Sequence, residues 1–128
     1  MRIFKNKWFH RFASKNEIDD GALLDAIERA NNGLIDADLG GGILKQRIAR
    51  EGQGKSTGYR AVIFYRKGEK AFFMFGFAKS DQENLQKKEL EEYKDAAKLY
   101  LRLTEKQISE MIKRGSLVEV KNDKKIQK

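Results

Sequence analysis

The sequence contains no cysteine and only one histidine, His10, and these absences restrict its chemistry. A chain without cysteine has neither disulfide bonds nor thiolate metal ligands, and a single histidine cannot build a multi-histidine metal site. We therefore expect a protein of a reducing compartment whose chemistry uses no metal ion and no small-molecule cofactor.

Long apolar runs are also missing. No window approaches about 18 uninterrupted apolar residues, the length typical of a membrane-spanning helix. The basic start, MRIFKNKWFHRF, lacks the continuous apolar stretch of a signal peptide. The sequence thus predicts a cytoplasmic protein that does not associate with a membrane.

What the chain does contain is enough apolar material for a core beneath a strongly basic surface. Its 128 residues are 40% hydrophobic and 36% charged, with a formal net charge of +8. This length predicts one domain over residues 1–120 and a charged, frayed tail over 121–128. The positive charge favours a polyanionic partner such as nucleic acid, although lysine-rich helices alone also raise net charge.

The chain begins with a predicted strand and a short aromatic helix. The strand covers residues 2–5, and Trp8, Phe9 and Phe12 then lie at spacings that place them on one helix face. We expect all three rings to enter the core.

A second helix is expected directly afterwards. Asp19 or Asp20 supplies its N-cap, and the helix runs to about Asn31 and closes at Gly33. The two helices are expected to form an αα hairpin.

The middle of the chain has the period of strands. From Leu39, residues alternate between two faces, and a glycine-rich loop follows over residues 51–57. The segments 59–66 and 70–78 are rich in β-branched and aromatic residues and are separated by a short turn. An antiparallel meander of at least three strands is predicted.

Two capping motifs predict helices in the last third. Each pairs Ser or Thr with Glu or Gln three positions later: Ser80 with Glu83, and Thr104 with Gln107. A final short strand is expected over residues 117–120. The predicted fold is therefore α+β, with an N-terminal strand, an αα hairpin, an antiparallel meander and C-terminal helices.

One short motif suggests a nucleotide site. Residues 49–56, AREGQGKS, satisfy a loose form of the Walker A pattern. A phosphate loop needs a helix immediately after Lys-Ser, whereas the residues that follow are strand-like. The context therefore disfavours an NTPase.

The positions of five cations are more informative. Lys45 and Arg47 share a strand face, Lys55 lies in the loop, Arg60 begins the next strand and Lys79 ends the last. In an antiparallel meander these positions converge at one end of the sheet and form a basic patch for a phosphodiester backbone. The alternative is that they are ordinary solvent-exposed charges.

Aromatic residues of the paired strands offer rings that stack on bases, and we assign Tyr59 to RNA binding, while most of these rings are expected in the core. Histidine is the side-chain type whose ordinary pKa lies closest to neutrality, so His10 is a candidate general base. It lies far in sequence from the basic strands, so a surface or interhelical position is the favoured interpretation.

The order of elements and two sequence stretches carry a family resemblance. The opening MRIFKNKWFHRFA and the segment from GLIDADLGGGILKQRIAR through KSTGYR to FGFAKSDQENL resemble the RelE/ParE toxin superfamily, in particular its HigB-like branch. The resemblance covers roughly residues 2–103. It implies a type II toxin that inhibits translation by cutting messenger RNA on the ribosome without a metal ion, and that a cognate antitoxin neutralises.

The resemblance also implies roles for individual residues. Arg60 matches the family's arginine and is the first choice to stabilise the transition state, while Lys45, Arg47 and Lys55 match basic positions that hold the RNA backbone. After the last strand, where related toxins often carry Tyr, His or Arg, this chain has Lys79, Ser80 and Asp81. The general base is therefore unassigned. Lys55 and Lys79 are candidates, since neighbouring cations lower a lysine pKa.

Two other functions use the same scaffold. A ParE-like protein poisons DNA gyrase without cutting RNA, and a non-catalytic module only binds RNA. Fold alone does not decide among them.

Overall fold

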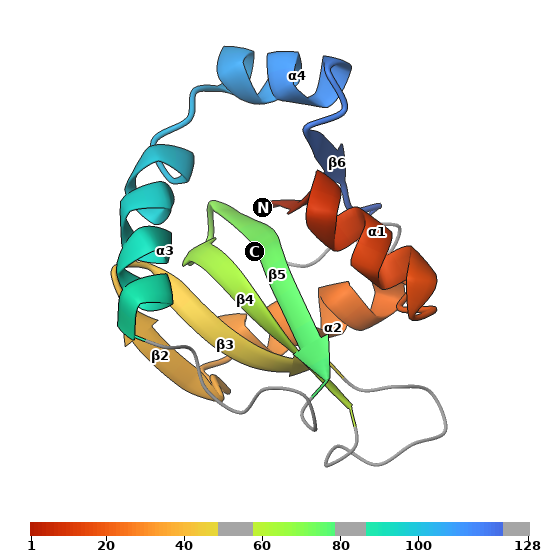
Figure 1. Ribbon diagram of the computed structural model, residues 1–128, viewed down its shortest axis with the longest axis vertical. Helices are drawn as coiled ribbons and strands as arrows, with labels where there is room; N and C mark the ends of the chain where they lie inside the picture. The colour runs from red at the N-terminus through yellow and green to blue at the C-terminus, as the bar shows by residue number, and fades with distance from the viewer. Residues whose placement is uncertain (49–57, 79–86, 122–128) are drawn as a thin grey trace.

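The computed structural model describes residues 1–48, 58–78 and 87–121, and it is an α+β fold built on one six-stranded sheet (Figure 1). The strand order across the sheet is β2-β3-β4-β5-β1-β6. The elements follow the chain as β1 (Arg2–Asn6), α1 (Lys7–Lys15), α2 (Asp20–Asn31), β2 (Ala37–Gly40), β3 (Ile43–Ile48), β4 (Tyr59–Arg66), β5 (Lys70–Ala78), α3 (Lys87–Tyr100), α4 (Glu105–Lys113) and β6 (Leu117–Glu119).

The predicted meander is confirmed, and the N-terminal strand extends it into a mixed sheet. Strands β3, β4 and β5 pair antiparallel in sequence order. Strand β1 lies parallel to β5, with Arg2 opposite Lys70 and Lys5 opposite Phe73, and pairs antiparallel with β6 on its other side. The first and last strands of the chain are therefore neighbours.

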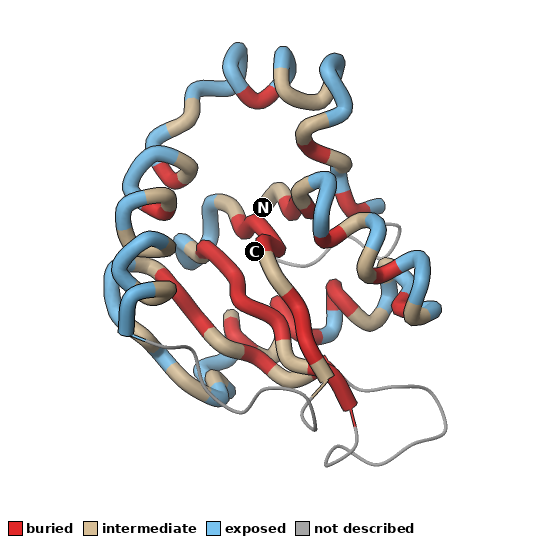
Figure 2. Tube along the Cα trace, viewed as in Figure 1, coloured by how far each residue is buried: buried red, intermediate tan, exposed pale blue. Residues whose placement is uncertain are grey.

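Helices cover both faces of the sheet (Figures 1 and 2). On one face α1 and α2 bury a cluster that includes Phe9, Leu23 and Ile27. On the other, α3 and α4 pack over a cluster that includes Phe64 and Phe72. The alternating strand residues thus supply two apolar layers, one for each pair of helices.

Side-chain caps begin the helices where the sequence predicts them. Asp19 is the N-cap of α2, and its carboxylate accepts a hydrogen bond from the amide of Ala22. Thr104 and Gln107 form the complete capping box of α4. The predicted start of the preceding helix at Ser80 lies outside the described residues, and α3 is described from Lys87 onward.

The region around Leu39 differs from the prediction. Two strands, β2 and β3, lie there, separated by a turn in which Gly40, Gly41 and Gly42 all have positive φ angles. A Cβ at Gly42 would also lie 2.6 Å from a methyl carbon of Leu101. Glycine adopts these angles without strain, so the chain reverses direction there. The alternation of side chains between the two faces therefore restarts in β3.

The expectation that all three N-terminal aromatics enter the core is wrong for Trp8, whose exposed fraction is 44%, whereas Phe9 is fully buried. Trp8 lies beside the sheet and stacks on Phe75 with ring centroids 4.5 Å apart. Phe12 contacts Gly76 so closely that a Cβ there would lie 2.4 Å from its ring.

Candidate nucleic-acid interface

The structure brings Lys45, Arg47 and Arg60 together on one face of the sheet. Arg47 and Arg60 are directly opposite in the β3–β4 ladder, and Lys45 is opposite Val62. Since residues two apart on a strand share a face, the three cations lie on the same side as Val62, the side against which α3 packs. The predicted convergence of these three positions is confirmed.

Arg60 has an unusual environment for a cation. Its side chain is partly buried, and its Nη1 atom is fully buried without a hydrogen-bond partner among the described residues. Burial lowers the pKa of the Arg60 guanidinium, the charge of Arg47 lowers it further, and Asp36 raises it. The missing hydrogen bond is one that an anionic oxygen, such as that of a phosphate, accepts.

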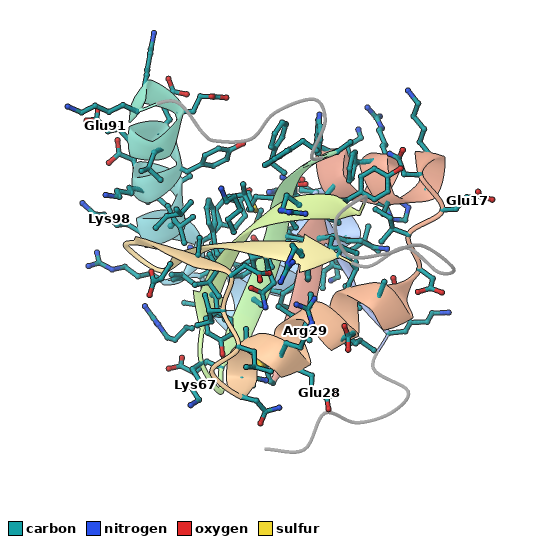
Figure 3. All side chains as sticks on the ribbon, turned by 90° about the horizontal axis from the view of Figure 1, so that it is seen from below. Glu17, Glu28, Arg29, Lys67, Glu91 and Lys98 are labelled. Carbon is teal, nitrogen blue, oxygen red and sulfur yellow. The ribbon has the colours of Figure 1, made fainter. Side chains whose placement is uncertain are left out.

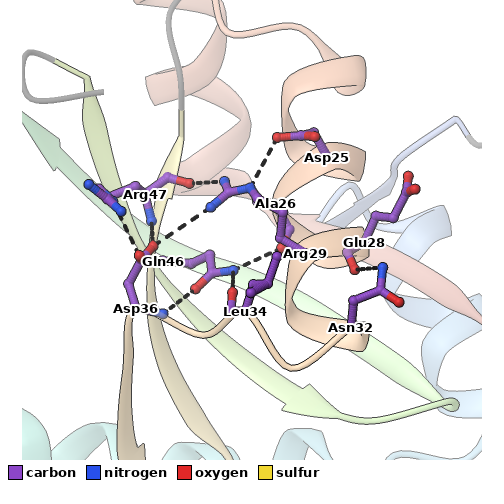
Figure 4. Close-up of polar contacts among 9 residues, drawn as sticks. All are labelled: Asp25, Ala26, Glu28, Arg29, Asn32, Leu34, Asp36, Gln46 and Arg47. Atoms are coloured by element: carbon purple, nitrogen blue, oxygen red, sulfur yellow. Dashed lines mark hydrogen bonds and ion pairs between the residues drawn. The ribbon is translucent and has the colours of Figure 1, made fainter. Parts of the chain in front are cut away.

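Arg47 is held in place by two residues that lie outside the sheet ladder (Figures 3 and 4). Asp36, just before β2, accepts hydrogen bonds from the Arg47 amide at 2.7 Å and from its Nε at 3.2 Å. Arg29 points from α2 toward β3, and its Nη2 donates to the Arg47 carbonyl at 2.5 Å. Arg47 is therefore a partly neutralised, fixed cation rather than a freely moving one.

Gln46 connects the same region to α2 through its buried side chain. Its side chain is fully buried, its Nε2 donates to the carbonyls of Ala26 and Leu34 at 3.0 Å, and its Oε1 accepts from the amide of Asp36 at 2.9 Å (Figure 4). These three bonds join β3 to the middle of α2, at Ala26, and to the segment that carries Leu34 and Asp36. The position of Asp36 thus depends on a buried polar contact.

Tyr59 does not join the cations. It is 8% exposed and lies in the cluster beneath α1 and α2, on the opposite face from Arg60, and its hydroxyl donates to Asn16 Oδ1 at 3.0 Å. This position gives a base no access to the ring face. The strand's period of two explains the difference, because adjacent residues point to opposite faces.

The other sequence candidates have separate outcomes. His10 lies on α1, partly buried, in an element that contacts β5, β1 and β6. Lys55 and Lys79, with the Walker-like segment from residue 49, lie outside the described residues. Their predicted roles remain predictions.

Sequence reasoning missed Arg29, Asp36 and Gln46. Asp25 and Arg29 have the i, i+4 spacing of a helical ion pair, which the structure contains at 3.2 Å, but nothing in that spacing indicates a contact with Arg47. Asp36 lies eleven residues before Arg47, across an unpredicted turn. Only the pairing of β2 with β3 brings them together.

Within the described ranges, no helix has the length and apolar character needed to cross a bilayer, and no three His, Asp or Glu side chains are grouped as metal ligands.

Comparison with known families gives a clear result. The model of the RelE toxin of the RelE / RelB toxin-antitoxin system matches residues 1–120. The chain belongs to the RelE toxin family. A comparison with individually curated proteins gives no match.

Membership explains the arrangement of this RelE toxin. The order of one strand, two helices, a sheet and C-terminal helices is consistent with the RelE-like fold. Membership also implies a cognate antitoxin as a partner, because the family forms toxin-antitoxin systems.

Proposed function

We propose that this toxin inhibits translation by cutting messenger RNA on the ribosome, in the cytoplasm, without a metal ion. The observation that carries the proposal is the buried, unpartnered Nη1 of Arg60 beside Arg47, within the described part of a RelE-family toxin. The stretch from GLIDADLGG to KSTGYR supports placing the chain in the HigB-like branch.

The proposed chemistry uses the substrate's own 2′-hydroxyl. The 2′-oxygen forms a bond to phosphorus as its proton leaves, the bond from phosphorus to the 5′-oxygen breaks, and that oxygen takes up a proton. Negative charge grows on the non-bridging oxygens along the way. Arg60 donates to one of these oxygens, where a preorganised donor lowers the barrier most, while Arg47 and Lys45 hold the backbone in line.

Proton transfer is assigned to a lysine. Lys55 and Lys79 remain the candidates for general base and acid, because a lysine close to other cations has a lowered pKa. Lys55 is also proposed to contact the RNA backbone.

Mapping messenger RNA ends after brief expression of the toxin tests the proposal. We expect new ends inside coding regions that disappear when translation initiation is blocked. DNA breaks without new RNA ends would identify a gyrase poison instead. Binding of RNA without any new ends would identify a non-catalytic module.

Alanine variants of Lys45 and Arg47 test the binding role. Each phosphate contact on single-stranded RNA contributes about 0.7 to the slope of log affinity against log salt concentration. We expect each variant to bind RNA more weakly and to lower that slope by about this amount, measured by RNA binding between low and physiological salt. An Arg11→Ala variant, altered at an exposed position on α1, is the charge-matched control. Unchanged slopes in both test variants would place the RNA elsewhere.

A further inference from the structure

Asp36 is a carboxylate within a surface that the proposed function assigns to a polyanion. It lies next to the cations, with a side chain only 23% exposed, and it contacts Arg47 through both oxygens. Oδ2 also lies 3.8 Å from Nη1 of Arg29. A negative charge at this place is expected to weaken RNA binding, so its presence there needs a physical explanation.

The arrangement of the cations around Asp36 supplies this explanation. Arg47 and Arg60 are cross-strand partners on one face, an arrangement in which like charges repel. Asp36 binds the backbone amide and the Nε of Arg47, and Arg29 binds the Arg47 carbonyl. Arg47 is therefore held at its backbone by both residues and at its Nε by Asp36, which favours one orientation of its side chain.

The same contacts leave Arg60 available. Asp36 acts on Arg60 only through its charge, since no hydrogen bond joins the two among the described residues, and Nη1 of Arg60 has no partner there. One carboxylate thus fixes the first arginine and offsets the repulsion between the two. Nη1 of the second arginine keeps a hydrogen-bond donor that no described residue uses.

We propose that Asp36, supported by Arg29, is a positioning residue of the cleavage site. It orients the Arg47 side chain relative to Arg60. It weakens ground-state RNA binding while raising the rate of cleavage. The inference rests on the proposed function, because it assigns these arginines to the scissile region of RNA. A fixed pair of cations meets the charge that develops at phosphorus without reorganising, whereas a mobile pair binds phosphate but stabilises the transition state poorly.

The variant Asp36→Asn separates this role from simple scaffolding. Asparagine keeps an oxygen that accepts from the Arg47 amide but removes the charge that orients the guanidinium. On ribosomes programmed with a defined messenger RNA, we expect the maximal single-turnover rate to fall by about 10- to 100-fold. The toxin concentration at half-maximal rate should stay the same or decrease. The salt slope of RNA binding should not decrease, since Lys45, Arg47 and Arg60 are all retained.

Two further variants complete the experiment. Asp25→Asn makes the same charge change on a residue that binds Arg29 at 3.2 Å but does not contact Arg47, and it should retain wild-type kinetics. Asp36→Glu should recover part of the rate. Thermal unfolding of each variant shows whether the fold is retained.

Three outcomes would overturn the inference while wild type still cuts ribosome-bound RNA. These are an unchanged rate in Asp36→Asn, an equal loss in Asp25→Asn, and a parallel loss of rate, affinity and thermal stability. If wild type fails to cut RNA on translating ribosomes, the proposed function itself is wrong and the inference falls with it.

Discussion

Replacing Arg60 with alanine is expected to lower the rate of messenger RNA cleavage by about 100- to 1,000-fold, the cost typical of one preorganised transition-state donor. The physical reason is that Arg60 is the described cation with a buried, unpartnered guanidinium nitrogen, beside a second arginine. The measurement is single-turnover cleavage on programmed ribosomes, with growth inhibition as the cellular readout.

Two control variants separate the effect of positive charge from the effect of the planar guanidinium with its paired donors. Lys67→Ala removes a positive charge from the turn at the far end of the β4–β5 hairpin, where the side chain is exposed (Figure 3), and it should leave the rate unchanged. Arg60→Lys retains the charge but loses the planar pair of donors, so an intermediate rate is expected. A folded Arg60→Ala protein that cuts at the wild-type rate would remove this residue from the mechanism.

The largest effect on stability is expected for Gln46→Leu, which should lower the free energy of unfolding by about 2 to 4 kcal/mol. Leucine has a similar volume, but it leaves the carbonyls of Ala26 and Leu34 and the amide of Asp36 without their partner. One of these bonds is fully buried and two are partly buried, so water replaces only some of the lost contacts.

Urea unfolding followed by circular dichroism measures this difference. Gln107→Leu is the matched control: it removes an exposed amide whose oxygen accepts from the Thr104 amide in the α4 capping box, and it should cost about 1 kcal/mol. Equal stability losses for the two variants would show that burial of the Gln46 network adds nothing.

The elements that the sequence predicts best are those set by local chemistry. The hairpin of β4 and β5 has the predicted bounds, because two runs of β-branched and aromatic residues flank a turn containing Gly68, whose φ is positive. The caps at Asp19 and Thr104 follow from short side chains that bond the first free amides of a helix. These signals act within a few residues and need no tertiary contact.

The features that the sequence could not predict depend on contacts between distant segments. Strand β2 is four residues long and half exposed, too short to show a clear period. The hydrogen bonds between Asp36 and Arg47 form only because β2 folds back on β3 through a turn with three glycines. Of the proposed site, the cluster of Lys45, Arg47 and Arg60 was predictable from alternation, whereas the residues that orient it were not.

The position of β1 constrains the order in which the toxin acquires its structure during synthesis. This strand precedes the other described strands in the sequence, yet its neighbours in the sheet are residues 70–73 and 117–119. Pairing between such distant segments must first overcome the entropy of closing the intervening loops. The sheet is therefore completed only once the segment that carries β6 is available to pair with β1, so a chain cut before residue 117 lacks the antiparallel neighbour of β1.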